Sequence, residues 1–395
     1  MRIKPGRISI VLTLAVAAQV SLTCQAPTHL DRPTVPATQP LVRTVVAPTP
    51  TSGQATGAVP HVTATTQPST PSPEPTATPV RSEEPDSPDA ASLASLARVD
   101  DYPLYTMVYY GPYTSTTTSA GPVDGTRRPV EPGWACSLLA ALDDPEERVF
   151  GRNFDWRYSP ALLLFTDPPD GYASASMVDI AYLIGPGDAG RLTDVPIEAR
   201  VPLLEAPLWP FDGMNEHGLG VGMAAVPESQ MPYDPTKPTI GSLGIIREIL
   251  DQARDVEEAL IVMQGYNITW DGGPPLHYLM ADAAGQAVLV EFVDGEMVLI
   301  PRPEQDPWHA ATNHWRSGVG RGEASGCWRY ATIEEALART AGRLTAAEAL
   351  DLLADVSQEE TQWSVAYNLT SRELHVTMGR DYEDTHVFEL MMMDE

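Results

Sequence analysis

The sequence has few cysteines and few basic residues. Three of its 395 residues are cysteines, and 25 Lys and Arg stand against 53 Asp and Glu, which gives a net charge of −28. A nucleic-acid-binding protein needs a basic footprint, so this charge argues against that class of protein. The excess of acid favours solubility outside the cytoplasm. With so few cysteines, the chain also lacks a disulfide framework.

The N-terminus lacks a hydrophobic run long enough to span a membrane. The apolar run 8–20 follows Arg2, Lys4 and Arg7, a pattern typical of a secretory signal in residues 1–24. Its end, Val20-Ser21-Leu22-Thr23-Cys24, resembles a bacterial lipoprotein cleavage site with Cys24 as the lipidated residue. Simple secretion is the alternative. We therefore expect an extracytoplasmic protein, either secreted or anchored to the membrane at the cell surface through Cys24.

Residues 25–97 have few aromatic residues and no hydrophobic period, and they are rich in Pro, Thr, Ser and Ala. Such a segment cannot bury enough apolar surface to offset its ordering entropy. We expect a disordered stalk, or a plain linker with no spacing role. Residues 98–135 are predicted to be a leader, propeptide or small subunit with one strand near 102–110. The remainder, 136–395, is long enough for one large domain.

One predicted hairpin carries most of the chemical information. Cys136 begins the apolar run 136–142, an acidic turn follows at 143–147, and 148–152 is typical of the returning strand. If Leu142 pairs with Arg148, Cys136 lies opposite Phe154.

In that register Arg152 and Asp155 flank the sulfur of Cys136 within one or two residue steps of about 3.3 Å each. A thiol needs a nearby cation to ionise near neutral pH, and an arginine keeps its charge. The alternative is an ordinary hairpin with a buried cysteine and a surface ion pair. Arg and Asp are costly beside an apolar strand unless they are paired or functional, which favours a reactive cysteine. Because Arg152 and Asp155 are three residues apart, a regular strand would point them to opposite faces, and we expect a bulge or strand end near Asn153.

The remaining pattern predicts an α+β domain built on mostly antiparallel sheets. Helices are predicted from 242, from the cap Asp255, over 332–337 and from the capping box of Thr345 and Glu348. A tight polar turn is predicted at 212–218, and an Asp294-Gly295 hairpin turn follows a meander. Further strands are predicted at 179–185, 219–224, 277–282, 287–293, 296–300, 308–313, 362–368 and 373–378.

Several blocks occur together in a fixed order. They are Cys136, Gly151-Arg152-Asn153-Phe154-Asp155, Asp212-Gly213-Met214-Asn215-Glu216-His217-Gly218-Leu219, His277-Tyr278-Leu279-Met280-Ala281-Asp282, Thr312-Asn313, Trp328-Arg329-Tyr330 and Trp363-Ser364-Val365-Ala366-Tyr367-Asn368. As a set they resemble the choloylglycine hydrolase family, which includes bile salt hydrolases, penicillin V acylases, acid ceramidase and N-acylethanolamine acid amidase.

The resemblance implies an N-terminal nucleophile (Ntn) hydrolase with a four-layer αββα sandwich, acting on linear amide C–N bonds. Cleavage of the Ala135–Cys136 bond would free Cys136, whose α-amine, with an ordinary pKa of about 7.7–8.0, would act as the base. Arg152 would hold the thiolate and Asp155 the α-amine. Asn313 would donate to the oxyanion, and Arg329 would support Cys136 and Asn313. Alternatively, Asn313 simply ends a strand and Arg329 caps a helix or pairs with a surface acid.

Two further features bear on the substrate. Bile salt hydrolases carry an asparagine ten residues after the Asn of their turn, but counting from Asn215 reaches Ala225 here, which disfavours a bile salt. The long leader is more similar to the acid ceramidase branch, in which it is kept as a small subunit. Four apolar residues could line an acyl pocket, although such residues more often belong to a core: Trp156, Phe211, Met214 and Met223.

The expected partner is a small-molecule N-acyl amide. Neither a metal nor another cofactor is expected, since His217, His277, His309 and His314 lack metal-binding spacing. Cys136 and Cys327 either pair, or at least one stays free. A surface binding module that kept the fold without the chemistry is the alternative function. A papain-like Cys–His hydrolase would need a base that no histidine pattern marks.

Overall fold

The computed structural model describes residues 87–113, 135–185, 190–227, 231–270, 273–317 and 326–390, all in one compact unit. The predicted signal (1–24), the stalk as far as residue 86 and the leader segment 114–134 lie outside the described residues. Among the residues described, no helix is both long and apolar enough to cross a membrane.

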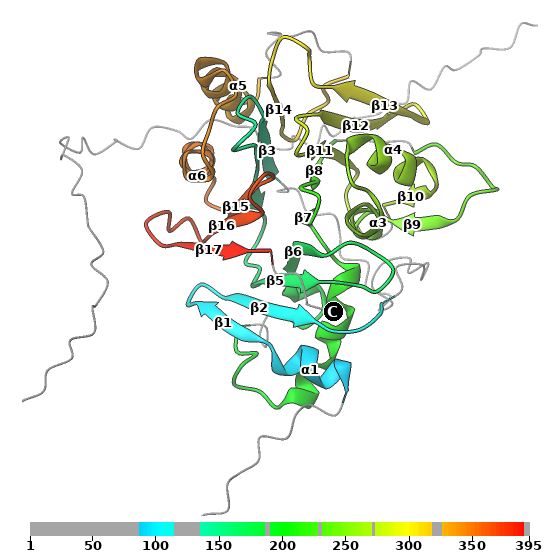
Figure 1. Ribbon diagram of the computed structural model, residues 1–395, viewed down its shortest axis with the longest axis vertical. Coiled ribbons are helices and arrows are strands. Elements are labelled where there is room, and N and C mark those ends of the chain that lie inside the picture. Colours follow the sequence, from blue (N-terminus) through cyan, green and yellow to red (C-terminus); the bar gives the residue numbers. More distant parts are fainter. Residues whose placement is uncertain are drawn as a thin grey trace, which may run out of the picture. The chain divides into compact units, whose positions relative to one another are not determined.

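Two sheets pack face to face, and helices cover the outer side of each (Figure 1). The described strands of the first sheet, sheet B, run in the order β14-β3-β4-β15-β16-β17, and all of its neighbours are antiparallel. Its strands are β3 (Ala135–Ala141), β4 (Val149–Asp155), β14 (Trp308–Ala311), β15 (Thr361–Asn368), β16 (Glu373–Met378) and β17 (Thr385–Glu389).

The second sheet, sheet A, runs β1-β2-β5-β6-β7-β8-β11-β12-β13 and is antiparallel except where β2 pairs with β5. Its strands are β1 (Ala97–Asp100), β2 (Leu104–Tyr109), β5 (Ala161–Thr166), β6 (Ser174–Asp179), β7 (Asp212–Asn215), β8 (Gly220–Ala225), β11 (Leu276–Ala281), β12 (Ala287–Val293) and β13 (Glu296–Pro301). A separate parallel pair is formed by β9 (Thr239–Gly241) and β10 (Asn267–Thr269).

Helices α5 (Trp328–Thr340) and α6 (Ala346–Asp355) cover sheet B, where Ile333 and Leu353 share a core with Leu139. Helix α3 (Gly244–Gln252), with α4 (Val256–Gln264) beside it, covers sheet A. The predicted α+β, four-layer αββα architecture is therefore confirmed. The remaining helices are α1 (Pro88–Ala94), η1 (Ile180–Tyr182) and η2 (Ile197–Leu208).

The two sheets approach closely because β8 presents glycines to sheet B. A Cβ on Gly222 would lie 2.9 Å from the Leu138 side chain, and one on Gly220 would lie 3.2 Å from Phe150. Real Cβ contacts this short are rare, so the small residues are needed at this face. Because successive side chains of a strand alternate, the neighbouring Met223 points away from sheet B. Tyr278, which pairs with Met223, points the same way, and its hydroxyl donates to the Ser242 carbonyl just before α3.

Several local predictions are confirmed. The Asp255 side chain accepts from the Glu258 N–H at 2.9 Å, and the capping box of Thr345 and Glu348 opens α6. Asp294 and Gly295 both have positive φ, as a tight hairpin turn requires.

Four predictions are wrong. The stalk does not extend to residue 97, because Ser87 caps α1 through the Ala90 N–H and Leu93 is buried. The described part of the predicted leader, 98–113, contains most of β1 and all of β2 rather than one strand.

The strand predicted at 179–185 is instead η1, because the Asp179 carboxylate accepts from the Ala181 N–H and ends β6. Residues 212–215 of the predicted turn form β7, and the turn itself occupies only the residues between β7 and β8.

A buried histidine makes the fold sensitive to acid. His309 on β14 donates from Nε2 to the Ile300 carbonyl and accepts the Ala310 N–H at Nδ1, both at 2.9 Å, so the ring is neutral in the folded chain. Burial lowers its pKa from 6.5 to about 4, and the nearby Arg316 and Arg302 charges act in the same direction.

We predict that His309 makes stability fall with decreasing pH. Below pH 6.5 the unfolded chain binds a proton at this histidine, whereas the folded chain binds it only near pH 4. The neutral ring therefore contributes about 3 kcal/mol to the free energy of unfolding above pH 6.5, and this contribution is lost by about pH 4. Chemical unfolding from pH 7.5 to 3.5 should show a flatter profile for His309→Gln than for wild type. His314, whose pKa is also lowered to about 4, should flatten it further in the double variant with His314→Gln. Parallel profiles for wild type and the single variant would contradict this account.

Candidate active site

Cys136 lies near the start of β3, with its side chain on the face of sheet B that meets sheet A. It pairs with Phe154, so the register predicted from the hairpin is confirmed. The thiol is free, which excludes the alternative of a bond between Cys136 and Cys327. The residue is 2% exposed, and burial raises the pKa of the Cys136 thiol, against the opposing charge of Arg152. The continuous chain therefore holds a sheltered, protonated thiol.

Arg152 points to the same inter-sheet face and joins the two sheets. Its Nη2 lies 3.5 Å from the Cys136 sulfur, and its Nη1 donates to Asp212 Oδ2 at 2.5 Å and to the Phe211 carbonyl at 2.7 Å. The Tyr367 hydroxyl donates to the other Asp212 oxygen at 2.5 Å. Burial alone would lower the pKa of Arg152, but the Cys136 and Asp212 charges raise it. Arg152 is therefore a fixed cation beside the sulfur.

Asp155 occupies the opposite face of β4 and does not reach the sulfur with its side chain. Its carboxylate accepts from Thr361 Oγ1 at 2.6 Å and Gln358 Nε2 at 2.9 Å, and lies 3.8 Å from Arg329 Nη1. Burial raises the pKa of Asp155, while Arg329 and these hydrogen bonds oppose the rise.

The bulge or strand end predicted near Asn153 is wrong. The pairing of β3 with β4 has no register shift from Ala135 to Ala141. Arg152 and Asp155 therefore act from opposite sides of one regular strand, as strand alternation requires. The irregularity lies in β15, between Thr361 and Trp363.

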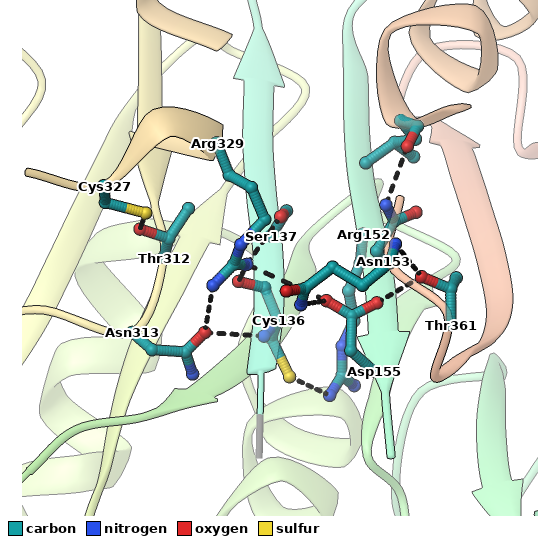
Figure 2. A network of polar contacts seen from close by, with 12 residues as sticks. Cys136, Ser137, Arg152, Asn153, Asp155, Thr312, Asn313, Cys327, Arg329 and Thr361 are labelled. Atoms are coloured by element: carbon teal, nitrogen blue, oxygen red, sulfur yellow. Dashed lines mark hydrogen bonds and ion pairs between the residues drawn. The ribbon is translucent and has the colours of Figure 1, made fainter. Parts of the chain in front are cut away.

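Asn313 and Arg329 hold the backbone of the cysteine (Figure 2). Asn313 Oδ1 accepts the Cys136 N–H at 2.7 Å and Arg329 Nη2 at 2.9 Å, and its Nδ2 donates to the Ala225 carbonyl at 2.9 Å. Arg329 Nη1 donates to the Cys136 carbonyl and, at 2.9 Å, to Ser137 Oγ. In the continuous chain the Cys136 N–H thus goes to Asn313, whereas the sequence predicted that Asp155 would hold the freed amine.

The structure brings together all five predicted catalytic residues. The four predicted acyl-lining residues are all buried in the core that also contains Cys136: Trp156, Phe211, Met214 and Met223. The Phe211 ring packs edge-on against Phe154 at 5.2 Å. Met223 lies on the face of β8 turned toward α3. Its predicted position beside the nucleophile therefore does not agree with the direction of its strand.

Sequence reasoning missed the partners that hold these groups. The sequence predicts a turn at Asp212 and strands at Ser137 and Tyr367, and it predicts no role for Thr361. Asp212 begins one of the blocks that carried the resemblance, but no local pattern connects it with Arg152. Asn215, by contrast, shapes its turn, since its Oδ1 accepts the His217 and Leu219 N–H groups.

No histidine in the described part of the chain contacts the Cys136 sulfur in the polar network of the site, which removes support for a papain-like base. The described residues with a geometry that could hold a metal are Asp100, Asp384 and His386, whose ligand atoms lie within 4.8 Å of one another. His386 Nε2 already pairs with Asp100 at 2.8 Å and shares no contact with the cysteine. We interpret this group as an ion pair that joins β1 to β17.

Comparison with known structures finds similar folds at low identity. A mutant conjugated bile acid hydrolase from Clostridium perfringens is 16% identical with a TM-score of 0.46, covering 65% of this chain and 92% of that one. Penicillin V acylase from Agrobacterium tumefaciens is 15% identical at a TM-score of 0.40, with 62% and 82% covered. The Caenorhabditis elegans N-acylethanolamine-hydrolyzing acid amidase ortholog is 12% identical at 0.39, with 60% and 93% covered. No curated protein sequence matches the chain.

Residues 136–300 match the sequence model of the linear amide C-N hydrolases, choloylglycine hydrolase family. The match begins at the cysteine and contains Arg152, Asp155 and Asp212. Asn313 and Arg329 lie beyond its end, yet the fold returns both to Cys136. This segment of the chain is therefore similar to the choloylglycine hydrolase family of linear amide C-N hydrolases.

Proposed function

We propose that the protein is an exported cysteine amidase that hydrolyses an N-acyl amide, with Cys136 as an N-terminal nucleophile freed by cleavage after Ala135. One observation carries the proposal. The Arg152 cation lies 3.5 Å from the Cys136 sulfur, while Asn313 and Arg329 hold the N–H and carbonyl of the same residue. A merely structural cysteine needs no such arrangement of charge around it.

The first step frees the nucleophile. The Cys136 sulfur attacks the Ala135 carbonyl carbon, the peptide C–N bond breaks, and the proton of the thiol passes to the departing nitrogen. Water then hydrolyses the thioester, which leaves a carboxylate on Ala135 and an α-amine on Cys136. The new amine titrates near neutral pH when unperturbed, so it can serve as the base that an internal cysteine lacks.

In the second step the α-amine takes the thiol proton and the thiolate attacks the carbonyl carbon of the substrate. Arg152 stabilises the thiolate, and Asn313 Nδ2, released from the Ala225 carbonyl, donates to the oxyanion. The amine product leaves with the proton, and water hydrolyses the acyl-thioester. Asp155 and Arg329 hold the α-amine and backbone of Cys136 from the helix side of sheet B.

The leader remains bound after cleavage in this proposal. Six residues of β2 pair with β5, and Leu104, Tyr105 and Met107 are fully buried. The Tyr102 hydroxyl donates to Gln362 at 2.8 Å, and the Tyr113 hydroxyl donates to Asp251 at 2.9 Å. Separating this segment would expose an apolar edge of sheet A.

Export is the part of the proposal that the N-terminal sequence supports. The basic start, the apolar run 8–20 and Cys24 favour secretion or lipid attachment at the cell surface. Such a location suits an enzyme that scavenges or inactivates extracellular amides.

We predict that purified wild-type protein is cut between Ala135 and Cys136 and that Cys136→Ala is not. The physical reason is that the alanine has no sulfur to attack the preceding carbonyl. N-terminal sequencing and intact mass identify the new terminus, and size-exclusion chromatography should show both fragments eluting together. An active wild-type enzyme that remains uncut at this bond would overturn the mechanism.

We predict that Arg152→Lys and Asp155→Asn fold but turn over poorly. A lysine cannot reach the sulfur, Asp212 and the Phe211 carbonyl at once, and a displaced cation of this kind should lower kcat by roughly 100-fold, as a misplacement of about 1 Å does. Asn at 155 removes the charge opposite Arg329 while keeping the shape. Steady-state kinetics measures kcat in each variant, and unfolding midpoints show whether the variant still folds. A kcat near that of wild type in either variant would show that the hairpin is structural.

We predict that the substrate carries a fatty-acyl or aromatic-acyl group. Trp156, Phe211 and Met214 belong to the buried apolar core that contains Cys136, and Ala225 stands where bile salt hydrolases carry an asparagine. The measurement is hydrolysis of fatty-acyl ethanolamides, acyl-homoserine lactones, penicillin V and bile-acid conjugates, each with and without iodoacetamide. Hydrolysis of an acyl amide that thiol alkylation abolishes is expected, and turnover of bile-acid conjugates alone would reverse the ranking.

A further inference from the structure

A second buried carboxylate lies on sheet A, outside the predicted catalytic set. Glu291 on β12 and His277 on the neighbouring β11 both have fully buried side chains. Glu291 Oε1 accepts the Arg316 N–H at 2.7 Å and contacts His277 Nδ1 at 3.2 Å, and Oε2 accepts the Ser317 N–H at 2.8 Å. Burying a carboxylate costs desolvation free energy that hydrogen bonds must compensate, and the Glu291 carboxylate receives three such bonds.

These bonds also keep Glu291 ionised. Burial acts to raise its pKa, but the donations from His277, Ser317 and Arg316 outweigh this and lower it. The hydrogen bond to Glu291 Oε1 also orients the His277 ring. Because a carboxylate oxygen accepts, the proton of the ring lies on Nδ1.

The segment that Glu291 holds is the one that carries Asn313. Residues 312–317 follow β14, and Asn313 lies only three residues before Arg316. On the other side, α5 holds the same segment, because Arg329 donates to Asn313 Oδ1 at 2.9 Å and the Arg316 guanidinium lies 4.1 Å from the centre of the Tyr330 ring. Sheet A and α5 therefore fix this segment from two directions.

We propose that Glu291, oriented by His277, is a positioning residue that fixes Asn313 against Cys136. This inference rests on the proposed function, in which Asn313 donates to the oxyanion. Glu291 touches neither the sulfur nor Asn313 and acts through the backbone N–H groups of residues 316 and 317. Its loss lets the segment move, and the Asn313 amide leaves the place where negative charge develops.

The chain offers a matched control on the same hairpin. Asp282, just after β11, is also a buried carboxylate that accepts backbone N–H groups, from Val256 at 3.1 Å, Ala284 at 3.0 Å and Gln286 at 2.9 Å. Asp282→Asn removes a comparable charge and comparable bonds from the turn between β11 and β12. It therefore reports the loss of stability without the loss of positioning.

The experiment compares Glu291→Gln with Asp282→Asn in the full chain. Gln keeps one acceptor but turns an N–H₂ group toward the second backbone N–H, so hydrogen exchange of residues 312–317 should accelerate in this variant alone. With the best acyl amide of the substrate panel, kcat should fall about 10- to 100-fold while KM changes little, because about 1 Å of misplacement costs up to 100-fold. If Glu291→Gln does not fold, His277→Ala replaces it, and His277→Asn, which restores an N–H toward Glu291, should recover part of the lost kcat.

Each outcome decides the inference. Faster exchange over 312–317 with a selective loss of kcat supports it. Exchange unchanged from wild type, or a loss of kcat no larger than that of Asp282→Asn, overturns it. If wild type hydrolyses no amide, the proposed function fails, and the exchange comparison still decides whether Glu291 positions the Asn313 segment.

Discussion

The buried guanidinium of Arg152 is the interaction on which the rest of the structure depends. It lies between two sheets with no exposure to solvent, where an unpaired charge would cost several kcal/mol. Asp212 from sheet A neutralises it at 2.5 Å, and Tyr367 from sheet B holds Asp212 in turn. The pair joins the layers of the sandwich and presents Nη2 to the Cys136 sulfur. The same guanidinium therefore joins the two sheets and lies beside the sulfur, and neither sheet alone could bury this cation.

The site divides between the two faces of sheet B. On the inner face, Arg152 Nη2 lies 3.5 Å from the Cys136 sulfur. On the outer face, Arg329 donates to the Cys136 carbonyl, and the Asp155 carboxylate lies 3.8 Å from Arg329. This division follows from the period of two in a β-strand, which sends residues three positions apart to opposite sides. One short strand, β4, therefore supplies both a cation beside the Cys136 sulfur and an anion beside Arg329, and the two charges lie on opposite faces of the strand.

Parts distant in sequence complete the site from the edges. The chain before Cys136 contributes β1 and β2 to sheet A, so these two strands belong to the folded core as much as the strands after the cysteine do. Asn313 reaches the cysteine across 177 residues of sequence, on a segment that α5 and Glu291 hold from opposite sides. Rigid support of this kind fixes the position of the Asn313 side chain relative to Cys136.

The sequence alone determined the elements with local causes. The acidic turn set the hairpin register that places Cys136 opposite Phe154, and caps at Asp255 and Thr345 marked two helices. The ordered blocks predicted the layered fold and the five residues that meet at the cysteine. Only the tertiary structure decided that Arg152 pairs with Asp212, 60 residues away, that Met223 faces α3, and that Ser87 caps a helix within the predicted stalk. Those outcomes depend on how one sheet packs on another and on which faces become buried. That is a property of contacts between distant segments, and no local pattern of residues encodes it.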